Sequence, residues 1–377
     1  MSSSPDAPAP LKTPLHALHL ALGARMAPFA GYDMPIQYPT GVLAEHLHTR
    51  ARAGLFDVSH MGQGILSGPA AAARLETLVP GDLAALAQGR IRYTQFLNAS
   101  GGILDDLMVT RLPPAPNGDE RLFLVVNAAC KTQDFARLRT ALSELELEVL
   151  EDRALLALQG PQAAEVLATL APGFADMPFM SLREGSFGAT PLTVTRSGYT
   201  GEDGYEISLP ASAAETFAKG LLAHSQVLPI GLGARDSLRL EGGLCLYGHD
   251  IDETTSPVEA ALTWSISRRR RAEGGFPGAE RIQRELRDGP TRLRVGLLPE
   301  GRAPAREGTI ITDEAGAQIG LVTSGGFGPS LNGPLAMGYV AAAHAAIDTP
   351  VRLVVRGKPL PARIVALPFV PNRFYRG

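Results

Sequence analysis

Two adjacent carboxylates, Asp105 and Asp106, are the residues whose type and placement first suggest chemistry. They lie inside Ile103–Leu112, a run of mostly apolar residues that favour strands. Successive side chains of a strand point to opposite faces, so at least one of these acids meets an apolar environment. A buried carboxylate needs a partner, or its pKa must rise. The pair is therefore a functional acid, a structural ion pair or a cap at a sheet end, and the residues alone leave these alternatives open.

A second candidate is the segment Tyr199-Thr-Gly-Glu-Asp-Gly-Tyr-Glu206. If the glycines form a turn, Tyr205 and Ile207 share one face of the following strand, and Glu206 and Ser208 share the other. An acid beside an aromatic ring could hold a planar heterocycle by hydrogen bonding and stacking. Without further information, a plain hairpin with an exposed glutamate is the simpler interpretation.

The remaining clusters point to no metal or nucleotide site. The four consecutive arginines Arg268–Arg271 are interpreted as a solvated loop between domains, with docking of a phosphate or an acidic partner as the alternative. The segment Gly231–Asp236 has only two of the three glycines of a dinucleotide fingerprint. Cys130 and Cys245 have no neighbouring Cys or His ligand, so we expect neither a structural zinc site nor a disulfide, and a reducing compartment.

The elements that must position these acids are short and separated by many turns. Two β-hairpins are predicted, the first marked by Asn117-Gly118 and the second by the glycines at 201–204; their strands are Ile103–Leu112 with Arg121–Asn127, and Leu192–Tyr199 with Tyr205–Leu209. Helices are predicted over Thr132–Leu142, over Pro161–Leu170 with Pro161 at its first position, and over Ala213–His224 after a Ser212–Glu215 capping box. Strands and helices do not alternate regularly, which favours an α+β fold with antiparallel sheets.

Length and composition limit the remaining possibilities. The chain has 377 residues, 45% hydrophobic, and a formal net charge of −3, which allows two or three domains and gives no strong field for nucleic acid. No apolar run reaches the roughly 18 residues of a membrane span, and the first ten residues lack the features of a signal or transit peptide. We therefore expect no membrane or nucleic-acid partner and a cytoplasmic location in a bacterium. We predict a mobile tail at 1–12, a main region at 13–285, and a C-terminal β-barrel or sandwich at 286–377.

Taken together, the motifs resemble those of the glycine cleavage T-protein (aminomethyltransferase) family. The resemblance runs from about residue 13 to the C-terminus, with the motifs in family order and spacing. The matching stretches include TPLH (13–16), EHLHTRARAGLFDVSHMG (45–62), RYTQFLNASGGILDDLMV (92–109), LVVNAA (124–129), SGYTGEDGYEI (197–207), GLGARDSLRLEGGLCLYGHDIDETTSPVEAALTW (231–264) and PFVPNRFY (368–375).

The resemblance implies a three-lobed cloverleaf around a central folate cavity, with helices packed on antiparallel sheets and a β-barrel-like C-terminal lobe. It implies an enzyme that transfers the methylene of an aminomethyl group to tetrahydrofolate, giving 5,10-methylenetetrahydrofolate and ammonia. The donor would be the dihydrolipoyl arm of a transiently bound, lipoylated H-protein. Tetrahydrofolate would be a co-substrate, and neither a metal nor a flavin is expected.

Carried over residue by residue, the resemblance implies that the essential aspartate is Asp106. The implied folate contacts are Tyr93, Tyr199, Glu206 and Arg235. Whether Arg235 contacts folate or orients Glu206 is left open. Leu244 stands where some relatives have a tyrosine, so one contact to the ligand is expected to be missing, and Arg373–Tyr375 are left outside the predicted site.

Two other functions are weighed against this one. The folate lobe of a flavin-dependent dehydrogenase would need an upstream flavin domain, for which the sequence before residue 13 leaves no room. A non-catalytic folate-binding protein, of the type linked to iron–sulfur maintenance or tRNA modification, usually carries a KGCYxGQE-like motif. Here that place is taken by Glu241-Gly-Gly-Leu-Cys-Leu-Tyr-Gly248, which has no lysine.

Overall fold

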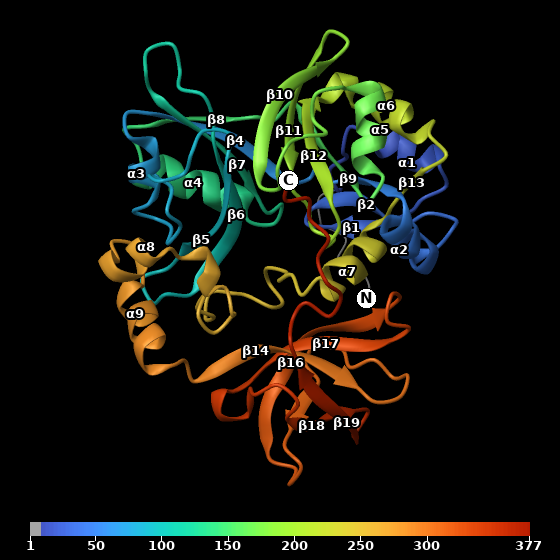
Figure 1. Cartoon of the computed structure of the whole chain (residues 1–377), viewed down its shortest axis with the longest axis vertical. Helices are drawn as coiled ribbons and strands as arrows, with labels where there is room; N and C mark the ends of the chain where they lie inside the picture. Colours follow the sequence, from blue (N-terminus) through green and yellow to red (C-terminus); the bar gives the residue numbers. More distant parts are fainter. Residues whose placement is uncertain (1–8) are drawn as a thin grey trace.

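The computed structural model describes residues 9–377 and has two large sheets, a two-stranded sheet, a closed barrel and surrounding helices (Figure 1). The six-stranded sheet consists, in spatial order, of β10 (Ser181–Phe187), β11 (Thr190–Arg196), β12 (Gly204–Pro210), β9 (Arg153–Gln159), β3 (Ala53–Asp57) and β13 (Val227–Pro229). The five-stranded sheet consists of β5 (Ile91–Leu97), β6 (Ile103–Arg111), β7 (Glu120–Val126), β4 (Gly62–Gly68) and β8 (Glu146–Val149). A small hairpin of β1 (Arg25–Phe29) and β2 (Tyr32–Gln37) completes the N-terminal part. All of these strand pairs are antiparallel except β13 with β3.

Helices cover the outer faces of the two sheets. The helices among the described residues are α1 (His16–Ala21), α2 (Val42–Ala51), α3 (Ala71–Leu75), α4 (Lys131–Ala141), α5 (Ala163–Leu170), α6 (Ala211–Leu222), α7 (Leu232–Glu241), α8 (Arg268–Glu273) and α9 (Ala279–Asp288). One apolar core lies between the six-stranded sheet and α5 and α6, and a second lies between the five-stranded sheet and α3 and α4. A third core, with Phe56, Phe123 and Leu155, joins the inner faces of the two sheets.

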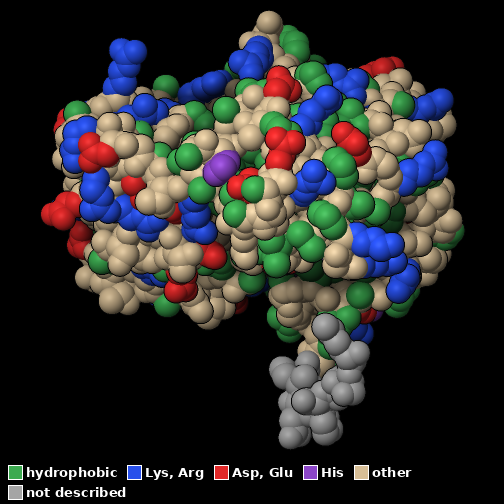
Figure 2. Space-filling view, turned by 90° about the horizontal axis from the view of Figure 1, so that it is seen from below, with side chains coloured by type: hydrophobic (Ala, Val, Ile, Leu, Met, Phe, Trp, Pro, Cys, Tyr) green, Lys and Arg blue, Asp and Glu red, His purple; other side chains and the backbone are tan. Residues whose placement is uncertain are grey.

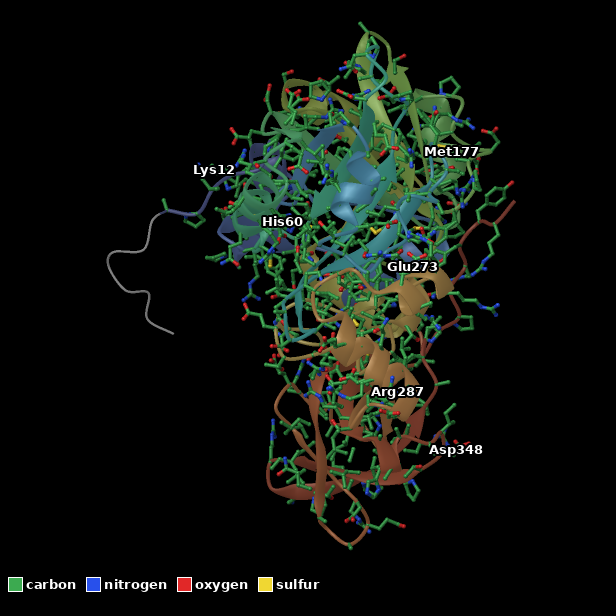
Figure 3. The ribbon with its side chains drawn as sticks, turned by 90° about the vertical axis from the view of Figure 1, so that its left-hand side faces the viewer. Lys12, His60, Met177, Glu273, Arg287 and Asp348 are labelled. Atoms are coloured by element: carbon green, nitrogen blue, oxygen red, sulfur yellow. The ribbon has the colours of Figure 1, made fainter. Side chains whose placement is uncertain are left out.

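The C-terminal lobe is a closed barrel, shown in orange and red in Figure 1. Its strands, in spatial order, are β14 (Arg292–Pro299), β17 (Gly333–Ala341), β16 (Gln318–Gly328), β15 (Ile310–Thr312), β18 (Pro350–Val355) and β19 (Lys358–Val365). The predicted α+β class with antiparallel sheets and a C-terminal barrel is thereby confirmed. In Figure 3 the chain descends from Glu273 in α8, past Arg287 in α9, to the barrel that carries Asp348.

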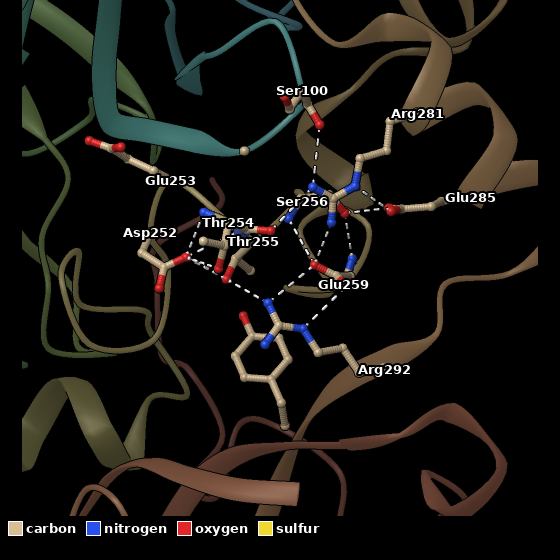
Figure 4. A network of polar contacts seen from close by, with 12 residues as sticks. Ser100, Asp252, Glu253, Thr254, Thr255, Ser256, Glu259, Arg281, Glu285 and Arg292 are labelled. Atoms are coloured by element: carbon tan, nitrogen blue, oxygen red, sulfur yellow. Dashed lines mark hydrogen bonds and ion pairs between the residues drawn. The ribbon is translucent and has the colours of Figure 1, made fainter.

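Buried ion pairs attach the barrel to the rest of the molecule. Glu259 is 4% exposed and accepts from Arg281 of α9 at 2.8 Å and from Arg292 of β14 at 3.2 Å (Figure 4). On the other side, Arg239 of α7 donates to Asp250 at 2.7 Å and to Ser324 of β16 at 2.9 Å. Removing one partner of a buried pair leaves an uncompensated charge, so these clamps fix how the barrel sits against the sheets.

Both predicted hairpins are present. β6 pairs with β7 and β11 pairs with β12, each antiparallel. Two details of the predicted helices are wrong. α5 begins at Ala163, so Pro161 precedes the helix, and Ser212 lies inside α6, whose N-cap is Pro210. In both cases the chain enters the helix directly from a strand or turn, and sheet packing rather than the local cap decides where the helix begins.

The interpretation of Arg268–Arg271 as a solvated loop is wrong, because the run forms most of helix α8. Arg269 pairs with Glu76 at 2.6 Å and with Asp82 at 2.7 Å, and Arg270 is only 4% exposed. Arg271 donates to backbone carbonyls, and only Arg268 is fully exposed. The guanidinium groups of Arg269 and Arg270 therefore attach α8 to the five-stranded lobe. The face in Figure 2 shows Lys and Arg interspersed with Asp and Glu, without a large area of one sign.

The described residues begin inside the predicted N-terminal tail. Residues 1–8 of the predicted mobile tail 1–12 lie outside the described residues. Leu11 is attached to the folded part of the chain. Its backbone N–H donates to the Gly31 carbonyl at 2.9 Å, and its carbonyl accepts from the Asp33 N–H at 2.8 Å. Helix α9 spans the predicted boundary at 285/286, and that boundary stays a prediction. Among residues 9–377, no helix has the length and apolar character to cross a membrane.

Two adjacent glycines of β16 provide a test of the barrel packing. A Cβ on Gly325 would lie 1.9 Å from the backbone oxygen of Ala305, whereas on Gly326 its nearest neighbour would be 3.6 Å away. We predict that Gly325→Ala lowers the free energy of unfolding by about 1–3 kcal/mol, since the backbone must shift. Gly326→Ala should change it by less than about 0.5 kcal/mol. Urea denaturation of both variants measures this, and equal effects would contradict the packing described.

Candidate functional site

Strand β6 presents its two acids to opposite sides of the five-stranded sheet. Asp105 is fully buried on the side of α3 and α4, together with Leu107 and Val109. Asp106 is half-buried on the other side, together with Met108. Met108 lines a recess between the inner faces of the two sheets, so Asp106 belongs to the wall that faces the six-stranded sheet.

Asp106 is held by two hydrogen bonds. Tyr93 of β5 donates from its hydroxyl to Oδ2 at 2.8 Å, and Asn127 donates from Nδ2 to Oδ1 at 2.7 Å. The same amide nitrogen donates to Asp105 Oδ1 at 2.9 Å, and the Asn127 backbone N–H donates to Asp105 Oδ2 at 3.1 Å. Asn127, directly after β7, therefore bridges both acids and fixes their orientation.

The surroundings make Asp106 a weak acid. Burial raises its pKa first, the negative charge of Asp105 raises it further, and the bonds from Tyr93 and Asn127 lower it only in part. The resulting pKa of Asp106 is about 7, against an ordinary value of 3.8. A group with a pKa near neutrality can both take up and release a proton at physiological pH, which suits acid–base chemistry.

Glu206 lies across the recess on β12, and the hairpin prediction for its neighbours is confirmed. Tyr205 and Ile207 are fully buried in the core below α5 and α6, while Glu206 and Ser208 line the recess. The hydroxyl of Ser197 donates to Glu206 Oε2 at 3.0 Å. Glu206 is half-buried, so the simpler interpretation of a plain hairpin with an exposed glutamate is wrong in its exposure.

Tyr199 and Arg235 form a stacked pair next to these acids. The Arg235 guanidinium carbon lies 4.7 Å from the centre of the Tyr199 ring, whose hydroxyl donates to the carbonyl of Cys245. Arg235 Nη1 is buried, and no hydrogen-bond partner for it lies among residues 9–377. Burial lowers the pKa of Arg235, and the charge of Glu206 opposes that shift. A buried N–H group without a partner indicates a place where an acceptor of a ligand binds.

The structure brings predicted residues together in pairs: Tyr93 donates to Asp106, and Arg235 stacks on Tyr199. Of the five, Glu206 lines the recess between the sheets. All five are half-buried: Asp106, Tyr93, Tyr199, Glu206 and Arg235. Glu206 is oriented by a hydrogen bond from Ser197, and no bond from Arg235 to Glu206 occurs in the described structure, which favours ligand contact for Arg235. Their roles stay predictions, because no ligand is bound.

Sequence reasoning missed Asn127 and Trp264. Asn127 is the first polar residue after the apolar strand β7, which pairs with β6. That position could have indicated a contact with Asp105 and Asp106. Trp264 is 62% exposed and stacks on the Tyr93 ring at 5.3 Å between centroids. Nothing in its local sequence indicated this contact, which depends on the 3₁₀ turn at Thr263–Ser265 lying beside β5.

The C-terminal tail also reaches this region, as the red segment of Figure 1 shows. Arg373 pairs with the buried Glu202, in the turn between Tyr199 and Glu206. Phe374 stacks on Phe179 with ring centroids 4.0 Å apart. The tail therefore helps to hold the turn that carries two of the predicted ligand residues.

Comparisons with known proteins agree with this architecture. Residues 15–270 match the GCVT N-terminal domain family, and residues 292–371 match the glycine cleavage T-protein C-terminal barrel domain family. The chain is 44% identical to the mitochondrial aminomethyltransferase of Dictyostelium discoideum, over 96% of this chain and 93% of that protein. It is 47% identical to the mitochondrial enzyme of Gallus gallus, over 100% of this chain and 96% of that one.

A solved structure supports the same assignment. The crystal structure of the glycine cleavage system aminomethyltransferase T from Bartonella henselae superposes with a TM-score of 0.91 at 47% identity, covering 97% of this chain and 99% of that chain. Sequence and fold therefore agree over nearly the whole length. The chain belongs to the glycine cleavage T-protein family.

The pKa of Asp106 leads to a prediction about stability. An acid whose pKa rises on folding binds more protons in the folded than in the unfolded state, so its contribution to stability falls as the pH rises from about 4 to about 7. Asp106→Asn removes that titration. We predict that the variant gains stability relative to the unmodified chain as the pH rises through this range, and that the gain levels off above it.

Urea denaturation of both proteins at intervals between pH 4.5 and 8 measures this difference. Asp152→Asn, at an exposed acid, should show no such pH-dependent gain. A difference between the Asp106 variant and the unmodified chain that is independent of pH would contradict the raised pKa.

Proposed function

We propose that this chain is the aminomethyltransferase of a glycine cleavage system. It transfers the methylene of an aminomethyl group, carried on the dihydrolipoyl arm of an H-protein, to tetrahydrofolate and releases ammonia. The observation that carries the proposal is a half-buried carboxylate with a pKa near 7, on the same strand face as Met108, which lines a recess that a second carboxylate lines from the opposite sheet. The family membership and the names of the relatives support the same activity.

The side-chain chemistry of the predicted residues suits a reduced pterin. A pterin edge carries several N–H donors, for which the Glu206 carboxylate supplies acceptors, with Ser197 keeping it in place. Arg235 Nη1, which has no hydrogen-bond partner among residues 9–377, suits a carboxylate of the folate glutamate or a ring oxygen. Tyr93 and Tyr199 supply aromatic faces and edges beside these polar groups. In this proposal all four residues bind and orient the co-substrate.

Asp106 carries the acid–base step. When bound, tetrahydrofolate supplies the two nitrogens between which the methylene is finally held. Asp106 accepts a proton from the nitrogen that closes the ring and, as an anion, stabilises positive charge that develops beside it. Tyr93 and Asn127 keep its two oxygens in a fixed direction, so little reorganisation is needed during the reaction.

The finer assignments are part of the proposal as well. Lipoylated H-protein is the proposed partner, bound transiently, and no metal or flavin is proposed. Among residues 9–377 there is no group of three or more His, Cys, Asp or Glu side chains placed to hold a metal ion. The two relatives from D. discoideum and G. gallus are mitochondrial by name, and a cytoplasmic location for this chain stays a prediction. The alternative of a non-catalytic folate-binding protein has no support among the named relatives.

The catalytic role of Asp106 is tested by Asp106→Asn, which keeps the shape and removes the charge. We predict a fall in kcat of about 10²–10⁴-fold, with the Kd for tetrahydrofolate changed less than about threefold. The assay follows methylenetetrahydrofolate and ammonia from aminomethylated H-protein. Asp152→Asn should behave as the unmodified chain. Full turnover by the Asp106 variant would refute the assignment, and no turnover by the unmodified chain would refute the function.

The ligand role of Glu206 is tested by Glu206→Gln. The amide replaces one acceptor by a donor, so tetrahydrofolate binding should weaken by about tenfold or more, since hydrogen bonds to charged groups contribute about 1.5–3 kcal/mol. Glu184→Gln, at an exposed position in the same sheet, is the matched control. Calorimetric titration with tetrahydrofolate measures both. Equal affinities of the two variants would show that Glu206 does not contact the ligand.

A further inference from the structure

A third carboxyl group lies behind the site, on the helix side of β6. Asp134 belongs to the first turn of α4, is 1% exposed, and contacts the carboxyl group of Asp105, which is 0% exposed. Arg137 donates to Asp134 Oδ1 at 3.0 Å. Asp134 Oδ2 is buried, and no N–H or O–H group of the described residues donates to it. Two acceptor groups therefore face each other with no donor between them unless one of them carries a proton.

The charges favour a shared proton. Two carboxylates in contact away from water cannot both be ionised, because their repulsion is poorly screened there. With one proton, the Asp105–Asp134 pair carries a single negative charge, which matches the single positive charge of Arg137. Burial and the contact with Asp105 raise the pKa of Asp134 to about 9, and Arg137 lowers it only in part.

We propose that Asp134 is a positioning residue, whose protonated carboxyl group donates a hydrogen bond to Asp105 and thereby holds the pair at a single negative charge behind Asp106. Asn127 connects the two outer members of this arrangement, since its amide donates to both Asp105 and Asp106. The anion of Asp105 raises the pKa of Asp106 across the strand. Asp134 thus controls the acidity of the site without reaching the recess. The inference rests on the proposed function, because the acidity of Asp106 matters for that reaction.

Other ionisable groups face the three acids from each neighbouring element. The Cys130 thiol, just before α4, contacts Asp105, and burial together with that carboxylate raises its pKa, so it stays protonated. On the side of Asp106, burial raises the pKa of Tyr93, Tyr199 and Cys245, which stay neutral at physiological pH, and it lowers the pKa of Arg235. Tyr247 lies near Cys130 and Asp105, and burial raises its pKa as well. Arg137 is the cation that contacts the pair directly. The proton on Asp134 is therefore the one whose loss would change the charge behind β6 near neutral pH.

Two substitutions of Asp134 test whether a neutral hydrogen-bond donor at this position is what sets the pKa of Asp106. Asp134→Asn keeps a neutral side chain that can donate to Asp105. Asp134→Leu places a larger apolar side chain there and removes the donor, so the negative charge of the pair behind Asp106 is no longer stabilised. We expect the titration midpoint of Asp106 to stay unchanged in Asp134→Asn and to fall by about one pH unit in Asp134→Leu.

The midpoint is measured by carbon-13 NMR of protein labelled at the aspartate carboxyl groups, with the Asp106 signal assigned from Asp106→Asn. Asp152→Asn is the control and should leave the midpoint unchanged. Equal shifts in both Asp134 variants, or none in either, would overturn the proposal. No folate or H-protein is present, so this result is independent of whether the proposed function is correct.

Infrared spectroscopy gives a second readout, which holds even if Asp134→Leu fails to fold. At pH 8 the unmodified chain should show the carbonyl stretch of a protonated, buried carboxyl group, and Asp134→Asn should remove it. Persistence of that band in Asp134→Asn, or its absence from the unmodified chain, would overturn the proposal. Asp106→Asn serves as the reference, because at pH 8 Asp106 is mostly ionised and its loss should leave the band in place.

Discussion

The site depends on one constraint: two consecutive acids on a strand must face opposite sides of a sheet, and one amide holds both. Asn127 donates to Asp105 and Asp106 together, which joins the helix-covered face of the five-stranded sheet to the recess. Because Asp105 is fully buried, its charge acts on Asp106 through a medium of low polarity. The raised pKa of Asp106 is therefore a property of the whole sheet-and-helix layer.

The rest of the fold serves to place a second wall opposite that sheet. The six-stranded sheet brings Glu206 to the recess because Tyr205 and Ile207 are anchored in the core under α5 and α6. The turn that precedes Glu206 is in turn held by the buried Glu202, which pairs with Arg50 of α2 and with Arg373 of the C-terminal tail. Residues from opposite ends of the chain thus fix one loop of the site. A substitution in the tail that breaks the Arg373–Glu202 pair would therefore alter the positions of Tyr199 and Glu206.

Features set by period and turn chemistry were predictable from the sequence. The hairpin of β6 and β7, the opposite faces of Asp105 and Asp106, and the shared face of Tyr205 and Ile207 all follow from alternation and glycine turns. The first residues of the helices were not predictable in this way, since Ser212 has the residue pattern of a cap but lies inside α6. The arginine run was misinterpreted for a similar reason. The partners of Arg269, Glu76 and Asp82, lie 193 and 187 residues away in sequence, and only tertiary packing shows that they are neighbours.

The contact between Asp105 and Asp134 shows most clearly why the chemistry of such a site cannot be assigned from its exposed residues alone. Asp134 appears in the sequence as an ordinary acid in the first turn of a helix, where the helix dipole favours negative charge. Burial against a second carboxyl group outweighs that preference, because the dipole contributes only about 0.3–1 kcal/mol at exposed helix ends, whereas an unpaired charge in the interior costs several. The acid that never meets the recess is thus the one that has to stay neutral, so that the acid facing the recess can exchange its proton near neutral pH.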